Sequence, residues 1–205
     1  LDETLADCDN VKVINDDVMK IDLHRVIEEE FNGEEVAVCA NLPYYITSPV
    51  IMKLLEDRLP ITSITVMVQK EAAVRICAAP GTRACGAVSV AVQYYSQPQI
   101  LFDVPRDCFF PAPNVDSAVI RLNIRTEPPV KLETEEKQFF KLVKAAFGQR
   151  RKTVLNSLST GLGKSKEELS AALQQAGIAP TARAEQLTME QFGTLCNLLF
   201  PNKAQ

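Results

Sequence analysis

Strand-like and helix-like segments alternate over the first 124 residues, and this alternation limits the folds that the chain can adopt. Short apolar runs rich in β-branched residues predict strands at 11–15, 35–40, 61–69, 99–105 and 116–124. Amphipathic segments between them predict helices at 21–31, 49–57 and 70–81, while 86–96 is compatible with helix or strand. Strands separated by helices are typical of βαβ units. We therefore expect an α/β fold with a mostly parallel sheet.

The pattern changes after Ile124. Residues 125–136 are polar, include Pro128-Pro129 and predict a linker. Ser165 followed by Glu168, and Thr188 followed by Gln191, are capping-box patterns, and Gly177 marks a helix end. The chain thus divides into an α/β domain at 1–125 and a small all-α domain at 126–205, with helices expected at 135–149, 151–163, 165–177 and 188–200.

Charge is distributed unevenly between these two parts. The chain has a net charge of −4, with 22 Lys and Arg against 26 Asp and Glu. Residues 1–125 carry 11 basic and 18 acidic side chains, a balance of −7, whereas residues 126–205 carry 11 and 8, a balance of +3. The second part is therefore the better candidate for binding a polyanion.

The six cysteines are scattered, form no C-x-x-C motif and are accompanied by one histidine. This pattern favours reduced thiols in the cytoplasm over disulfides, and it predicts no metal site. We expect most of the cysteines to be small core residues. No apolar run approaches the roughly 18 residues of a membrane span, so we expect no membrane partner.

The stretch "CANLPYYITSPV" at residues 39–50 places polar and aromatic groups where a buried strand should end. Ligands of open α/β sheets bind beyond the carboxyl ends of the strands. Asn41, a backbone carbonyl beside Pro43 and the ring of Tyr44 are suited to an amino group on a flat ring, such as that of adenine. Two acceptors would favour a pyramidal, nucleophilic amine, and the ring would stack on a base taken out of its helix. The alternative is a proline-bearing loop whose tyrosines fill the edge of the domain.

Two further stretches carry candidate nucleic-acid contacts. In "CFFPAPNVDSAV", Phe109 or Phe110 stands on a proline-stiffened loop, where either ring is a stacking platform or a core residue. In "AAFGQRRKTVLNSL", three consecutive cations at 150–152 open a predicted helix and are either phosphate ligands or a solvated face. The α/β part has no G-x-G turn after a strand, so the chain is a fragment or its ligand site is built differently.

Taken together, "NLPYYITSP", "FFPAPNVDSAVIRL" and "AFGQRRKTVLNSL" resemble the ribosomal RNA small-subunit adenine N6,N6-dimethyltransferases. The resemblance covers nearly the whole chain, and the last motif separates this family from other amino-methylases. It implies a Rossmann-like class I methyltransferase sheet and a small all-α C-terminal domain. The implied activity is dimethylation of two adjacent adenines near the 3′ end of small-subunit rRNA, with S-adenosyl-L-methionine as cofactor. The implied partner is this rRNA within the pre-30S particle, in the cytoplasm during ribosome biogenesis.

The resemblance also assigns roles to individual residues. It implies that the catalytic motif is Asn41, Leu42, Pro43 and Tyr44, and that Phe109 stacks on the target base together with Tyr44. The cofactor would be bound by Asn41 and by Asp17, which accepts from the amino group of the cofactor's adenine, with Val18 beside it. The RNA-binding residues would be Arg150, Arg151 and Lys152.

One departure from the family concerns the N-terminus. The family's glycine-rich motif and the acidic residue that binds the ribose would lie upstream of residue 1, so the chain resembles the family without its first third. We therefore expect these 205 residues alone to bind the cofactor weakly, to be inactive and to self-associate at an exposed sheet edge. Two alternatives remain open: a large-subunit rRNA adenine methylase of the macrolide-resistance type, and a non-catalytic ribosome-assembly factor.

Overall fold

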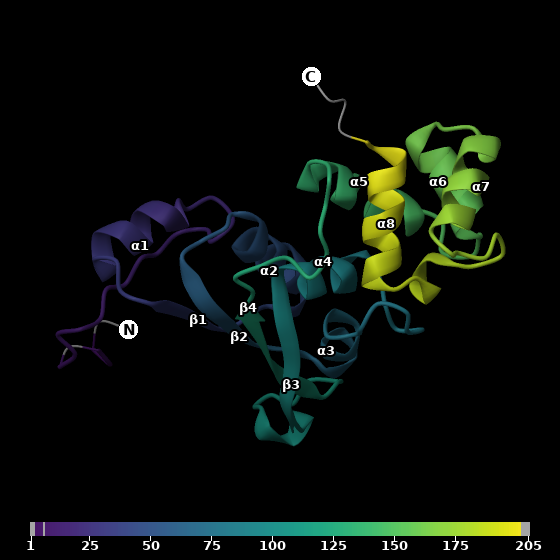
Figure 1. Ribbon diagram of the computed structural model, residues 1–205. Helices are drawn as coiled ribbons and strands as arrows, with labels where there is room; N and C mark the ends of the chain where they lie inside the picture. The colour runs from purple at the N-terminus through teal and green to yellow at the C-terminus, as the bar shows by residue number, and fades with distance from the viewer. Residues whose placement is uncertain (1–2, 6, 202–205) are drawn as a thin grey trace.

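A computed structural model describes residues 3–5 and 7–201 of the chain (Figure 1). A four-stranded sheet lies at its centre, and the C-terminal helices gather beyond one side of it. The strands are β1 (Val36–Asn41), β2 (Ile61–Gln69), β3 (Ser96–Val104) and β4 (Ser117–Ile124). These confirm four of the five predicted strands.

The sheet is mixed rather than mostly parallel. Its order is β1-β2-β4-β3; β1 and β2 are parallel, whereas β4 is antiparallel to both β2 and β3. The prediction of a mostly parallel sheet was wrong because β3 and β4 follow each other with only a loop and one 3-10 turn, and no α-helix, between them. A loop suffices to join antiparallel strands, whereas parallel neighbours require a longer crossover.

The strand predicted at residues 11–15 is absent from the structure. The segment has no regular structure, and Val11, Val13 and Ile14 are 45%, 50% and 43% exposed. Among the described residues, β1 lies at the edge of the sheet and pairs with β2 alone, and residues 11–15 do not pair with its open edge. An apolar pattern marks a segment that can become a strand, but its backbone groups also need a hydrogen-bonding neighbour.

Among the residues that the structure describes, the sheet-containing part has four α-helices: α1 (Leu23–Phe31), α2 (Thr47–Glu56), α3 (Lys70–Ile76) and α4 (Ala87–Tyr95). The Asp22 side chain caps α1 by accepting from the backbone N–H of Arg25 at 3.2 Å, and Asn32 ends it in the left-handed conformation. Helix α4 settles the ambiguity at 86–96, where a nearly continuous apolar run is buried. Such a run fits a buried helix as well as a buried strand.

The two faces of the sheet differ in burial, and this difference positions the candidate site. Ile64, Val66 and Val68 of β2 are at most 1% exposed and lie in the core. On the opposite face, Met67 and Gln69 of β2 are only half-buried. Asn41, the last residue of β1, pairs in register with Met67, so its side chain lies on this more open face.

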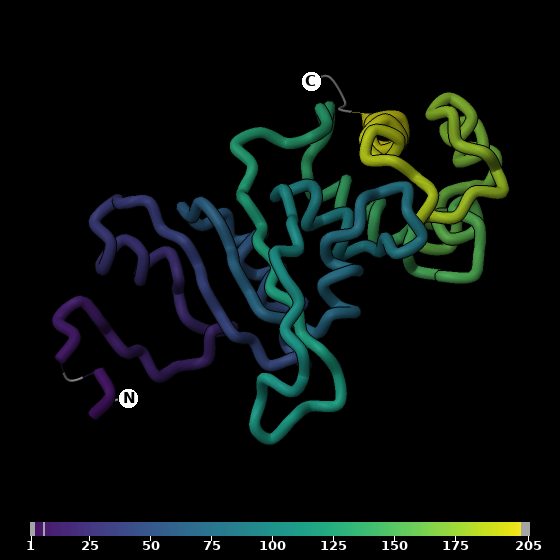
Figure 2. Tube along the Cα trace, turned by 90° about the horizontal axis from the view of Figure 1, so that it is seen from below, coloured from purple at the N-terminus to yellow at the C-terminus, as the bar shows by residue number. Residues whose placement is uncertain are grey.

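As predicted, the described residues of the C-terminal part, up to residue 201, contain helices and no strand: α5 (Glu136–Ala146), α6 (Val154–Leu162), α7 (Lys166–Gln175) and α8 (Met189–Leu199). The Ser165 hydroxyl caps α7, and Thr188 and Gln191 form a reciprocal capping box at α8. Gly177 follows α7 with φ of +66°, which an L side chain rarely adopts. Figure 2, seen from below, shows these helices set to one side of the sheet.

Four aromatic rings join the two parts of the chain, and we call them the ring cluster. Tyr94 of α4 stacks on Phe139 of α5 with centroids 5.0 Å apart, and Tyr95 stacks on Phe140 at 5.2 Å. The Tyr95 hydroxyl donates to Glu136 at 2.8 Å, and burial raises the pKa of Tyr94 to about 12 and that of Tyr95 further. The expected domain boundary at residue 125 stays a prediction, because 125–135 has no helix or strand but the ring cluster packs both parts together.

The cysteines are less buried than expected. All six are free thiols, of which Cys85 and Cys196 are buried and Cys77 is half-buried. The other three are exposed: Cys8, Cys39 and Cys108. The prediction that most lie in the core was wrong because it rested on residue type alone, and Cys39 points to the open face of an edge strand.

Within the described residues, no helix is long and apolar enough to cross a membrane.

The distribution of the cysteines predicts a two-phase reaction with an aromatic disulfide reagent at pH 8. Burial raises the pKa of Cys77 and Cys85 to about 11 and that of Cys196 to about 12, so their reactive thiolate is scarce at this pH. We expect the three exposed thiols to react in the first phase, and the other three only after a denaturant is added. Rapid release of six equivalents from the native protein would contradict this arrangement.

Candidate active site

The two motifs that suggest base chemistry line one cavity of about 400 Å³, which we call the first pocket. Residues 41–44, at the carboxyl end of β1, form part of its wall, and Met67 of β2 forms another part. The loop between β3 and β4 contributes Phe109, Phe110, Pro111 and Pro113. Segments almost 70 residues apart in the sequence are thus brought together, as the motif analysis required.

Hydrogen bonds hold the N-L-P-Y turn in place. The Tyr44 hydroxyl is 2.7 Å from the Ser117 hydroxyl, and Ser117 is fully buried at the start of β4. The Pro43 carbonyl accepts from the backbone N–H of Ile46 at 3.1 Å and from the Thr47 hydroxyl at 3.3 Å. Sequence reasoning missed Ser117. Its signal was a small polar residue at the end of "FFPAPNVDS", where an apolar strand begins.

Asp116 holds the loop that carries the second motif. Its carboxylate accepts from the backbone N–H of Arg106 at 3.0 Å, and its carbonyl accepts from the N–H of Lys70 at 3.0 Å. The loop is therefore tied both to its own start and to the end of β2. Phe109 is half-buried at the first pocket, whereas the Phe110 side chain is fully exposed.

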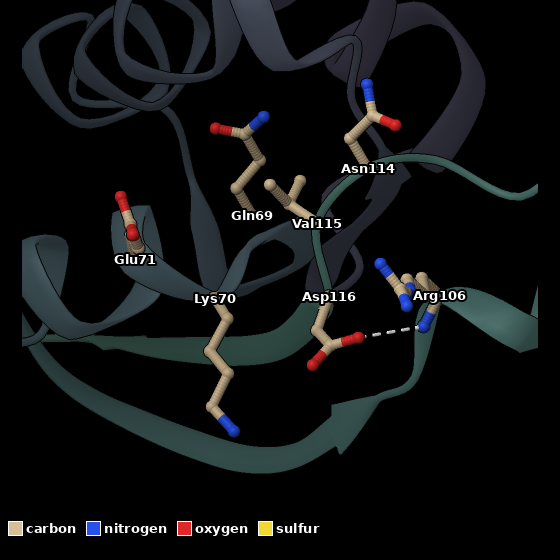
Figure 3. A pocket seen from close by; sticks show the side chains of 7 residues that line it. All are labelled: Gln69, Lys70, Glu71, Arg106, Asn114, Val115 and Asp116. Carbon is tan, nitrogen blue, oxygen red and sulfur yellow. Dashed lines mark hydrogen bonds between the residues drawn. The ribbon is translucent and has the colours of Figure 1, made fainter.

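The two ends of this loop line a second pocket of about 440 Å³ (Figure 3). It is lined by Gln69 at the end of β2, by Lys70 and Glu71 at the start of α3, and by four residues of the connection between β3 and β4, Arg106, Asn114, Val115 and Asp116. Lys70 donates to Asp103 of β3 at 2.6 Å, and this hydrogen bond raises the pKa of Lys70. Sequence reasoning did not predict this pocket, because the motif "FFPAPNVDSAVIRL" contains Asn114, Val115 and Asp116 but does not show that they lie beside the end of β2.

Asp17 and Val18, the predicted contacts to the cofactor's adenine, do not line the first pocket. Asp17 is exposed; its carboxylate accepts from the N–H of Met19 at 3.0 Å and lies 3.5 Å from the Lys20 ammonium. Val18 is half-buried against the core. Their proposed role stays a prediction.

The three predicted RNA-binding cations lie in a turn rather than in a helix. Arg150, Arg151 and Lys152 are exposed and precede Thr153, whose hydroxyl caps α6. The expectation that they open the helix was wrong by a few residues because Thr153 is the better N-cap. We call residues 150–152 the basic turn. It belongs to a segment, 137–164, with seven Lys and Arg residues and no acidic residue.

A groove of about 350 Å³ adjoins the basic turn between α5 and α6. Lys141 and Lys144 line it from α5, and Gly148 and Gly161 are among its small residues. A Cβ at Gly161 would lie 2.7 Å from the Cβ of Ala145, so glycine allows the two helices to approach closely. Among the described residues, no ion pair involves Lys141, Lys144 or the basic turn. No group of three or more described His, Cys, Asp or Glu residues is arranged to hold a metal ion.

Comparisons with known proteins agree with these motifs. The family model described as ribosomal RNA adenine dimethylase matches residues 1–200. A protein of Alkaliphilus oremlandii named ribosomal RNA small subunit methyltransferase A is 54% identical over 200 residues, which cover 97% of this chain and 69% of the relative. A protein of the same name from a Geobacillus species is 52% identical, with the same two coverages.

Two solved structures show the same fold. The 23S rRNA methyltransferase ErmE aligns with a TM-score of 0.66 and 25% identity, over 97% of this chain and 75% of that one. A dimethyladenosine transferase from Plasmodium falciparum aligns with a TM-score of 0.72 and 24% identity, over 94% and 74%. These matches confirm a Rossmann-like α/β methyltransferase fold. Because the family model covers almost the entire chain and the curated relatives are about half identical to it, the chain belongs to the ribosomal RNA adenine dimethylase family.

Proposed function

We propose that this chain carries the target-base and RNA-binding parts of an enzyme that dimethylates adenine N6 in small-subunit ribosomal RNA. The observation that carries the proposal is the first pocket, where the N-L-P-Y turn and the F-F-P-A-P loop face the same cavity. The names of the relatives that are about half identical support small-subunit rRNA as the substrate. We expect the enzyme to act on the pre-30S particle in the cytoplasm.

The residues at the pocket can create a nucleophilic amine from an unreactive one. The lone pair of adenine N6 is delocalised into the ring, so the amine must become pyramidal before it attacks. The Asn41 amide oxygen is one acceptor for its hydrogens. Because the Pro43 carbonyl is already engaged by two donors, we assign the second acceptor to the Leu42 carbonyl. Fixed acceptors of this kind stabilise charge that develops only in the transition state.

The aromatic groups of the pocket hold the base in position. The Tyr44 ring is fixed by its hydroxyl bond to Ser117, and Phe109 stands on the opposite motif. Stacking on aromatic rings contributes about 1–3 kcal/mol per base and offsets part of the cost of taking the base out of its helix. Holding the amine at a fixed distance and angle then provides much of the rate enhancement.

The residues present fit the methyl end of S-adenosyl-L-methionine. When bound, this cofactor supplies an electrophilic methyl group on a sulfonium. Asn41 is exposed and lines the first pocket, so its amide can contact both the cofactor and the target amine. The exposed Asp17 carboxylate is suited to accept from an exocyclic amine, and we propose that it binds the cofactor's adenine beside Val18.

Methylation of defined rRNA tests this function. A version of the protein extended by the segment that the longer relatives carry should dimethylate adenine in small-subunit particles, detected by mass spectrometry of nuclease digests. Methylation of large-subunit rRNA alone would instead favour a 23S rRNA methyltransferase activity, the one that ErmE's name gives. Tight binding of the particle without methyl transfer would favour a ribosome-assembly factor.

The basic turn yields a separate prediction about RNA affinity. Replacing Arg150, Arg151 and Lys152 with Gln should weaken binding of an rRNA fragment, because each cation that neutralises a phosphate releases counterions. We expect the slope of log K against log salt to flatten by about 0.7–0.9 for each lost contact. Fluorescence anisotropy at several salt concentrations measures this slope.

The matched control removes the same charge elsewhere in the C-terminal part. Lys131, Lys166 and Arg183 are exposed and lie outside the basic turn and its groove. Replacing all three with Gln should leave the slope of log K against log salt mostly unchanged. Equal slopes for both triple variants would assign the basic turn to an ordinary solvated surface.

A further inference from the structure

The first and second pockets lie side by side along one strand. Met67 lines the first and Gln69 the second, and residues two apart on a strand point to the same face about 6–7 Å from each other. The loop between β3 and β4 likewise passes from one pocket to the other, because Pro113 lines the first and Asn114, the next residue, lines the second. The two cavities therefore share a boundary formed by β2 and this loop.

The chemistry of the second pocket suits the edge of a base. The amide side chains of Gln69 and Asn114 extend to the same side, with Val115 between them (Figure 3). Neither amide forms a hydrogen bond with any described residue. Each amide has an NH₂ group that donates and an oxygen that accepts. This pair is complementary to adenine, whose N7 accepts and whose N6 amine donates, and Val115 adds an apolar surface.

The charges around this pocket disfavour a phosphate as its main ligand. Lys70 is engaged with Asp103, and the carboxylates of Glu71 and Asp116 also line the cavity. Arg106 is the remaining cation, and its closest acidic partner, Asp107, is 3.9 Å away. A phosphate would meet two carboxylates there, whereas a neutral base can use the amides.

An RNA chain that places one base in the first pocket must place the next nucleotide close by. Enzymes that act on an extruded base also select substrates through contacts to the nucleotides on either side of it. We propose that the second pocket binds an adenine directly adjacent to the target adenine, through the amides of Gln69 and Asn114. This inference rests on the proposed function, because it takes the first pocket as the site of the target base.

Binding of modified RNA tests the proposal without requiring turnover. In a labelled rRNA fragment, each neighbour of the target adenine is replaced in turn by 7-deazaadenine, which lacks the N7 acceptor, or by uracil. We expect one of the two positions to be sensitive, with uracil weakening binding about 5- to 100-fold, the range of losing a paired base contact. In the variant Gln69→Ala with Asn114→Ala, this sensitivity should fall to less than about twofold.

Two controls separate this inference from the function beneath it. Gln97→Ala with Gln99→Ala removes two exposed amides from β3, outside both pockets, and should leave the sensitivity unchanged. Replacing the target adenine itself should weaken binding in every variant that keeps the first pocket. If only the target position is sensitive, or if the double variant keeps the neighbour's sensitivity, the second pocket does not bind the neighbour. If replacing the target adenine also leaves RNA affinity unchanged, the first pocket does not bind the target base. The inference about the second pocket is then wrong as well.

Discussion

Asn41→Ala should lower the rate of methyl transfer by about 10²-fold or more while leaving RNA affinity nearly unchanged. This is the scale expected for removing one fixed acceptor that acts in the transition state. Asn41 lies at the end of β1, in register with Met67 and lining the first pocket, so the sheet fixes the backbone that carries its amide. Single-turnover methylation by the extended protein measures the rate, and anisotropy measures binding.

Asn123→Ala is the matched control for this variant. Asn123 lies on β4 of the same sheet but lines none of the pockets described above. Its replacement should leave the rate within about threefold, since this half-buried side chain lies outside both pockets and a substitution away from special features usually changes little. Near-normal single turnover by Asn41→Ala would show that the amide is not an acceptor for the reacting amine.

Phe139→Ala should destabilise the protein by about 3–5 kcal/mol, the typical cost of removing a buried aromatic side chain. Phe139 is fully buried on α5 and stacks on Tyr94 of α4. Its loss would leave a cavity where the sheet-containing part meets the C-terminal helices. Urea unfolding measured by circular dichroism gives the change in the free energy of unfolding.

A surface aromatic provides the comparison. Phe102 on β3 is 57% exposed, so Phe102→Ala should cost far less, about 1 kcal/mol or below. A loss below about 1 kcal/mol for Phe139→Ala would contradict the close packing of the ring cluster. Two separate unfolding transitions in the unaltered protein would make the division at residue 125 a true domain boundary.

Local patterns in the sequence were sufficient for most elements of the fold. Helices α2 and α7 follow from apolar spacing, and the caps at Ser165 and Thr188 follow from side chains that bond to nearby backbone. These features depend on neighbours within a few residues. The strand expected at 11–15 and the direction of β4 depend on distant partners, which a local pattern does not contain.

The candidate site divides in the same way. Asn41 and Phe109 were predicted from motifs, and the structure places both at the first pocket. Ser117 and the second pocket were not predicted, because their importance arises only when β4 pairs with β2 and brings Ser117 opposite Gln69. A serine or a glutamine carries no chemical signal until its neighbour in space is known.

The ring cluster also limits which nucleotides of a bound RNA can reach the first pocket. Residues 125–135 form an irregular connection that alone would let the C-terminal helices swing, yet four packed rings hold α5 against α4. The basic turn therefore lies at a fixed distance from the first pocket. An RNA bound at the turn could place only those adenines in the pocket that lie at this distance along the folded RNA. The choice of nucleotide would then depend on the shape of the RNA as well as on its sequence.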